Sequence, residues 1–148
     1  MVEALRACVL AVHGGTSAPG ARMSAQQQLD AFEMRPTAWR ECIGYIRAAR
    51  DPVVIAFLLG AIERAQTGTT SMAPGDRSAL RAFVLEFAVA AQRANFARFL
   101  LTKCAKILVD AAKIDWPTCY PDFFDQVLGL CQDTVLRPFG LQVLLTTI

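Results

Sequence analysis

Two prolines set four residues apart, with large aromatic residues around them, constrain this chain more than any other feature. The segment Lys113–Leu130 contains both, at Pro117 and Pro121. Proline lacks a backbone N–H and clashes with the preceding turn, so Pro117 predicts that an incoming helix ends near Trp116. Because proline is favoured in the first turn of a helix, Pro121 predicts the start of the next one. The segment is therefore predicted to be a tight joint between two antiparallel helices.

The joint is predicted to be structural. Its two prolines turn the chain, and its four aromatic side chains are expected to fill the corner between the helices. No side chain among them suggests a catalytic role. These six joint residues are Trp116, Pro117, Tyr120, Pro121, Phe123 and Phe124.

Apolar residues recur at helical spacing on both sides of the joint, and turn or capping residues separate the apolar stretches. Glycine and proline predict loops at His13–Met23 and Thr67–Gly75. No stretch alternates with period two for long, so no sheet is predicted. Eight helices are predicted, starting near Val2, Ser24, Pro36, Pro52, Asp76, Asn95, Pro121 and Pro138.

Three predicted helices matter most for the later comparison, because their apolar stripes define which face should be buried. The stripe of the sixth is Phe96, Leu100, Cys104, Ile107, Leu108, Ala111 and Ile114. The stripe of the seventh is Phe124, Val127, Leu128 and Cys131. The stripe of the eighth, Leu141, Leu144, Leu145 and Ile148, runs to the last residue without a cap.

The predicted fold class is all-α, an α-α superhelix (HEAT/armadillo-like solenoid) of about four antiparallel helix pairs. Dividing 148 residues among four pairs gives 37 residues a pair, a period that fits such repeats. Residues 1–148 are predicted to be one segment of a longer chain, because the last helix has no cap. Since each repeat covers its neighbour, the last pair is expected to expose apolar surface.

Composition excludes several classes of protein. The net charge of +2 is too small to argue for nucleic-acid binding. The longest apolar run, Pro52–Ile62, is too short to span a bilayer. The chain has one histidine, His13, and five cysteines without a Cys-x-x-Cys pair, so no metal site is predicted. We expect free, mostly buried thiols in a reducing compartment.

No catalytic constellation is present in the sequence. The glycines near Gly14 lack the Gly-Lys-Ser/Thr of a phosphate loop. His13-Gly14-Gly15 resembles an oxyanion-hole turn only superficially, because no Gly-x-Ser-x-Gly elbow and no second histidine accompany it. The chain is therefore predicted not to be an enzyme, with no catalytic, cofactor or metal residues.

The best candidate contact surface is a charged stripe on the sixth helix. It consists of Lys103, Lys106, Asp110 and Lys113, spaced three, four and three residues apart. The alternative is an ordinary solvated face, with Lys106 and Asp110 as an i,i+4 pair stabilising the helix by about 0.2–0.5 kcal/mol. A DNA-binding surface is a third interpretation, but it would require more lysine and arginine on neighbouring repeats than this sequence has.

The joint also carries a family resemblance. The motif Asp115-Trp116-Pro117-x-x-Tyr120-Pro121-x-Phe123 resembles the joint found early in exportins of the importin-β superfamily. The N-terminal half, with Pro36-Thr37-Ala38-Trp39 and a long apolar helix after Asp51, is similar to the importin-β N-terminal domain. The resemblance covers nearly the whole chain from Ser24.

This resemblance implies a nuclear export receptor, or karyopherin, that shuttles between nucleus and cytoplasm. The implied partners are the small GTPase Ran in its GTP form, a protein cargo such as the actin–profilin complex, and nucleoporins. In this family the second helix of each pair faces the GTPase. The candidate Ran-contact residues on those helices are Asp30, Glu63, Arg64, Lys103, Lys106, Asp110 and Lys113.

Two other functions stay open at this stage. One is a structural HEAT-repeat scaffold for protein–protein interaction without a GTPase partner, which predicts that charge reversal at Lys106 and Asp110 leaves partner binding unchanged. The other is a HEAT-like DNA glycosylase, which predicts steeply salt-dependent DNA binding.

Overall fold

The computed structural model describes residues 2–14, 18–68 and 72–147, and within these residues it contains helices and no strand. The chain divides into two compact units, Met1–Ile62 (unit 1) and Glu63–Ile148 (unit 2), with the boundary inside the fourth helix. The predicted all-α, helix-repeat class is confirmed. The helices are α1 (Val2–His13), α2 (Pro19–Glu33), α3 (Ala38–Ala48), α4 (Pro52–Thr67), α5 (Pro74–Arg93), α6 (Arg98–Asp115), α7 (Phe123–Gln132) and α8 (Arg137–Thr147).

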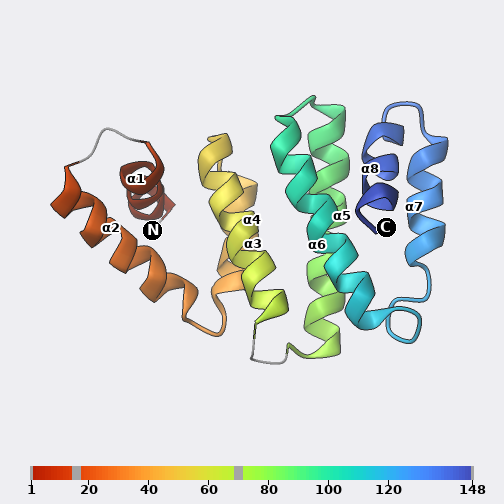
Figure 1. The fold of residues 1–148 in the computed structure, drawn as a ribbon, viewed down its shortest axis with the longest axis horizontal. Helices are drawn as coiled ribbons and strands as arrows, with labels where there is room; N and C mark the ends of the chain where they lie inside the picture. The colour runs from red at the N-terminus through yellow and green to blue at the C-terminus, as the bar shows by residue number, and fades with distance from the viewer. Residues whose placement is uncertain (1, 15–17, 69–71, 148) are drawn as a thin grey trace. The chain divides into compact units, whose positions relative to one another are not determined.

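Unit 1 is built on amphipathic helices, with α1 packed against α2 and α2 in contact with α3 (Figure 1). The inner face of α2 buries Leu29 and Phe32. Helix α3 buries Trp39, Cys42 and Ile46, which recur at helical spacing. The Asp51 side chain accepts a hydrogen bond from the Val53 N–H at 2.9 Å, which caps α4.

Unit 2 contains two closely packed antiparallel pairs, α5 with α6 and α7 with α8 (Figure 1). Helix α6 also packs against α8, so it is covered from two sides. Helix α5 contributes Leu80, Phe83, Val84, Ala88 and Ala91 to this core. For α6 the predicted stripe is right in its middle but wrong at its ends, because Phe96 and Ile114 are 44% and 50% exposed. Phe96 lies two residues before α6 begins and packs edge to face on Phe87 of α5, and Ile114 lies in the last turn of α6.

Several predicted helix starts are wrong, because prolines and backbone caps begin these helices in place of the expected side-chain caps. Helix α2 starts at Pro19, after Ala18, rather than at Ser24. Helix α5 starts at Pro74 rather than at Asp76. In both, proline occupies the first helical position, where its missing N–H costs no hydrogen bond. The third helix starts at Ala38, two residues beyond the predicted Pro36.

Asn95 ends a helix where it was predicted to start one. Its φ of 56° is left-handed, and its N–H donates to Gln92 O at 3.2 Å. The next N–H, of Phe96, donates to Ala91 O at 2.9 Å. These two bonds are the Schellman pattern of a helix C-terminus, in which asparagine is the common substitute for glycine. Helix α6 therefore begins three residues later, at Arg98.

The joint begins as predicted and ends later. Helix α6 stops at Asp115 with Trp116 as its C-cap, and the Trp116–Pro117 peptide bond is cis. Helix α7 starts at Phe123, so the prediction that Pro121 opens it is wrong by two residues; Pro121 lies in a turn. The face that α7 buries is consequently Phe123, Val127 and Leu130, and of the predicted stripe only Val127 is fully buried.

Helix α8 turns most of its leucines outward. It buries Phe139, Gly140 and Val143, while Leu141 and Leu145 are 48% and 70% exposed. The expectation that the last pair exposes apolar surface is therefore confirmed for the described residues. Ile148, like Gly15 in the first predicted loop, lies outside the described residues.

Candidate partner-binding site

The charged stripe of α6 lies on the narrow part of that helix that the core leaves uncovered. Ten of its 18 residues are buried, including Leu101, Ala105 and Val109, so the helix is covered on most of its circumference. The last turns of α4 carry two further predicted contact residues, of which Glu63 pairs with Lys106 of the stripe. We call the set the α6 ridge: Glu63, Arg64, Lys103, Lys106, Asp110 and Lys113.

Lys106 is the centre of the α6 ridge. Its Nζ lies 2.7 Å from Glu63 Oε1 and 2.7 Å from Asp110 Oδ2, so it bridges α4 and α6. The lysine side chain is 52% exposed, whereas the carboxylate side chains are 22% and 16% exposed. Glu63 and Asp110 remain predicted contact residues, but their carboxylates are far less exposed than the lysine between them.

The two carboxylates change the proton affinity of the lysine. The hydrogen bond to Asp110 raises the pKa of Lys106 most, followed by the hydrogen bond to Glu63. Both bonds favour the charged form of the lysine. Lys106 is therefore a cation held in place by two neighbours, where an ordinary surface lysine would have a mobile side chain.

The end of α4 is fixed against α6 by a second contact. The buried Gln66 side chain donates from Nε2 to Ile107 O at 3.0 Å. This bond anchors the turn that carries Glu63, so the position of its carboxylate beside Lys106 is set by the core. Breaking this hydrogen bond would leave a buried amide without a partner, which costs free energy, so the bond is expected to stay formed in the folded chain.

Four other predicted contact residues lie outside the ion pairs of Lys106. Arg64 and Lys113 are exposed and Lys103 is half-buried. Among the described residues, neither Lys103 nor Lys113 takes part in an ion pair. Asp30 belongs to unit 1, where its Oδ1 accepts a hydrogen bond from Gln26 Nε2 at 2.8 Å. The structure thus joins Glu63, Lys106 and Asp110 through ion pairs.

A buried ion cluster holds the joint against α5, and sequence reasoning missed it. The Asp115 carboxylate, 1% exposed, is contacted by Arg77 Nε at 2.9 Å and by Arg81 Nη1 at 2.6 Å. Arg81 Nη2 also donates to Cys119 O at 3.0 Å. We call Arg77, Arg81 and Asp115 the joint cluster. Its two arginines lie four residues apart on α5, which places them on one face and was the available signal.

The joint cluster organises only some of the joint aromatics. The Arg81 guanidinium stacks over the Tyr120 ring at 4.1 Å, and the Tyr120 hydroxyl donates to Gln126 Oε1 at 2.8 Å. Burial raises the pKa of Tyr120 to about 12. Tyr120 and Phe123 fill the corner as predicted, but Trp116 and Phe124 are 49% and 39% exposed and pack edge to face on its outside. For those two the prediction is wrong, because Tyr120 and Phe123 already occupy the interior.

The described residues contain no group of three or more His, Cys, Asp or Glu side chains able to hold a metal ion. All five cysteines are free thiols, as predicted. Only Cys42 and Cys104 are buried, so the expectation of mostly buried thiols is wrong; Cys119 is exposed in the joint. Among the described residues, no helix combines the length and apolar character needed to cross a membrane.

Comparison with known proteins identifies one kind of relative. The chain is 29% identical to mouse exportin-6 and to human exportin-6 over 123 residues, which is 82% of this chain and 11% of each relative. It is 28% identical to exportin-6-A of Xenopus laevis over 134 residues, which is 90% of this chain and 12% of that relative. No protein-family model matches. The predicted resemblance to the exportins is confirmed, and the matched region spans about a ninth of these relatives.

Proposed function

We propose that this chain is an N-terminal HEAT-repeat segment of a nuclear export receptor, and that the α6 ridge contacts Ran in its GTP form. The similarity to exportin-6 over most of the chain supports a transport receptor. The observation that carries the contact proposal is Lys106, an exposed cation held by two carboxylates at the centre of the ridge.

A pre-positioned charge suits a contact residue. A lysine already fixed by Glu63 and Asp110 loses less side-chain freedom on binding than a mobile one, so less of the binding free energy is spent on ordering it. The ridge has four cations and two anions, a net charge of +2. Such a surface favours a partner patch with acidic residues and disfavours a basic one.

The other partners belong to the same proposal. A receptor of this kind carries a protein cargo, such as the actin–profilin complex, contacts nucleoporins and shuttles between nucleus and cytoplasm. Catalysis is not part of it, because the GTPase chemistry would lie with Ran. Binding of Ran and cargo would be coupled, each raising the affinity for the other by the same factor.

The proposal is tested by titrating the chain with Ran loaded with a non-hydrolysable GTP analogue and, separately, with GDP, using calorimetry. We expect tighter binding to the GTP form. Equal affinity for the two nucleotide states would contradict the receptor proposal. A filter-binding assay with duplex DNA at two salt concentrations tests the glycosylase alternative, which requires steep salt dependence.

Charge reversal tests the position of the contact. Lys106→Glu and Lys113→Glu each reverse a charge on the α6 ridge, and within the described part of the chain Lys113 has no ion pair to lose. The matched control is Arg6→Glu on α1, whose side chain is 49% exposed. We expect the ridge variants to weaken Ran binding about tenfold, equivalent to ~1.4 kcal/mol. If all three variants bind alike, the ridge is a solvated face, as the scaffold alternative holds.

A further inference from the structure

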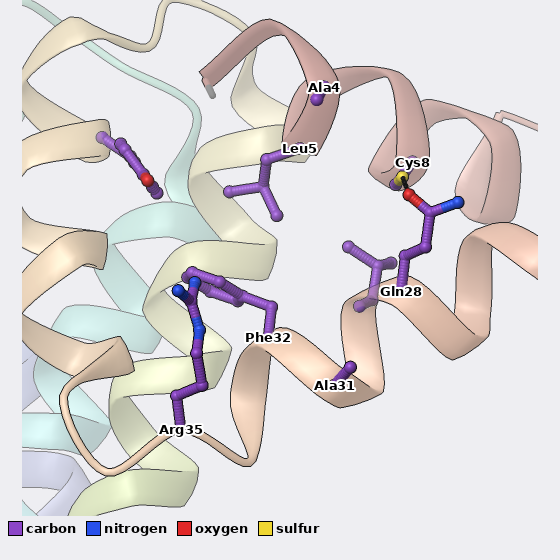
Figure 2. A pocket seen from close by; sticks show the side chains of 9 residues that line it. Ala4, Leu5, Cys8, Gln28, Ala31, Phe32 and Arg35 are labelled. Atoms are coloured by element: carbon purple, nitrogen blue, oxygen red, sulfur yellow. Dashed lines mark hydrogen bonds between the residues drawn. The ribbon is translucent and has the colours of Figure 1, made fainter.

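Unit 1 contains an apolar groove that the proposed function does not use. It has a volume of about 330 Å³ and lies between α1 and α2, with one residue of α3 at its edge. Figure 2 shows Leu5 of α1 and Phe32 of α2 turned toward it. Together with Leu29 these residues form a buried floor. We call this feature the α1–α2 groove.

The rim of the α1–α2 groove is open. Ala4 and Ala31 line it and are both exposed, so small side chains on facing helices leave the groove open above its buried floor. The volume is at the lower end of the roughly 300–1,000 Å³ of small-molecule sites. An open site of this size suits one or two apolar side chains presented by another polypeptide better than an enclosed ligand.

The two ends of the groove differ in polarity. At one end the Cys8 thiol donates to Gln28 Oε1 at 3.2 Å (Figure 2). At the other end is Arg35, the one charged residue among the groove's lining side chains. Its guanidinium lies over the Phe32 ring at 4.9 Å. A bound segment would therefore meet a neutral end and a cationic end.

Arg35 keeps capacity for a second acceptor. Its Nη2 is 2.9 Å from Glu41 Oε2, but that oxygen has no hydrogen bond of good geometry. A guanidinium carries five N–H donors in a planar fork, so one misaligned contact leaves most of them available. Glu41 does not line the groove. An occupant therefore meets the remaining N–H donors of Arg35, which suit a carboxylate acceptor, and does not meet the Glu41 carboxylate that pairs with it.

We propose that the α1–α2 groove docks a short acidic–apolar segment of a partner protein. A bulky apolar side chain of that segment inserts over Leu29, and a neighbouring aspartate or glutamate pairs with Arg35. The apolar floor supplies the affinity, and the cationic end selects the orientation and the acidic neighbour. This site shares no residue with the α6 ridge, and the docking proposal does not depend on Ran binding.

The test is an NMR titration of the ¹⁵N-labelled chain with the peptide acetyl-Gly-Leu-Glu-Gly-amide and with its Leu-Gln counterpart. We expect saturable shifts confined to amides of α1, α2 and the start of α3, with about threefold weaker binding of the Gln peptide, as for a partly exposed ion pair. Arg35→Gln should remove that preference. Equal binding of the two peptides by the unmodified chain, or shifts elsewhere, would overturn the proposal.

Filling the groove provides an independent check. Ala31→Leu places a larger side chain on the rim and should abolish binding of the Glu peptide. The matched control is Ala21→Leu, also at an exposed position of α2 but outside the lining, which should bind normally. Wild-type affinity in the Ala31 variant would rule out docking in the groove. Octanoate binding as tightly as the peptide would replace the peptide assignment with a lipid-like one.

The thiols give a second readout on the unmodified chain. Cys8 lines the groove and Cys119 is exposed in unit 2. Bound peptide should slow alkylation of Cys8 by iodoacetamide and leave Cys119 unchanged, as followed by mass spectrometry of each modified site. Equal alkylation of Cys8 with and without saturating peptide would contradict docking there.

Discussion

Removing the charge of Asp115 should destabilise unit 2 strongly. In the Asp115→Asn variant the side chain keeps its shape but no longer neutralises Arg77 and Arg81, whose side chains are 15% and 8% exposed. Breaking a buried ion pair by removing one partner costs about 3–5 kcal/mol, because an uncompensated buried charge remains. Asparagine can still accept one hydrogen bond, so we expect a loss of about 3 kcal/mol, at the lower end.

A loss of this size is measurable by urea unfolding followed by far-ultraviolet circular dichroism. Domains of this size have a total stability of about 5–15 kcal/mol, so 3 kcal/mol is a substantial fraction. At a slope of about 1.5 kcal/mol per M urea, the unfolding midpoint should fall by about 2 M. The matched control is Asp125→Asn, an exposed residue in the first turn of α7, for which we expect at most about 1 kcal/mol.

A double-mutant cycle shows whether the uncompensated charge is the cause. Adding Arg81→Met to Asp115→Asn removes one of the two stranded cations, so the double variant should be less destabilised than the sum of the single variants. If Asp115→Asn costs no more than Asp125→Asn, the joint cluster does not hold the joint. Strict additivity of the two changes would show that lost packing, and not charge, explains the effect.

Two further predictions concern α8 and the α6 ridge. Gly140→Ala would place a methyl group 2.8 Å from Cys131 Sγ and should destabilise the fold by about 1–3 kcal/mol. Gly129 has open space around it, so Gly129→Ala should stabilise α7 by up to ~1 kcal/mol. Urea unfolding of the two variants measures both effects. The Lys106 pKa is raised in the folded chain, so the lysine charge stabilises the folded state. This stabilisation of about 0.5 kcal/mol is fully present below the unfolded pKa of about 10.5 and is lost as pH rises through the folded pKa. The destabilisation of Lys106→Met relative to the unmodified chain should therefore be seen at pH 7 and shrink as the pH rises above the unfolded pKa, as measured by unfolding across that range.

The existence of the helices and most of their inner faces were predictable, because both depend on local periodicity. Residues such as Leu29, Cys42 and Leu100 recur at helical spacing whatever the rest of the chain does. Helix starts were less predictable, since several signals compete at each boundary. At α2 a first-turn proline at position 19 prevailed over a possible cap at Ser24, and at Asn95 a left-handed backbone prevailed over a side-chain cap.

The joint shows why a correct motif can be assigned the wrong interior. Its four aromatics are all large and apolar in the sequence, and only their places in the fold show which of them point inward. Within α7 the helical period places Phe123 and Val127 inside and Phe124 and Leu128 outside. Trp116 lies before α7, as the C-cap of α6, so its exposure is set by the end of α6 and not by the start of α7.

The candidate sites depend on contacts that no local pattern contains. The i,i+4 spacing of Lys106 and Asp110 predicted their pairing, and the structure has it at 2.7 Å. Glu63 is 43 positions away from Lys106, and it reaches the lysine only because Gln66 fixes the end of α4 on α6. The second carboxylate turns an ordinary helix pair into a bridge between two helices. The position of the Lys106 charge therefore depends on the buried Gln66–Ile107 hydrogen bond. A substitution that removes this bond should weaken partner binding by the α6 ridge, even though Gln66 itself is buried.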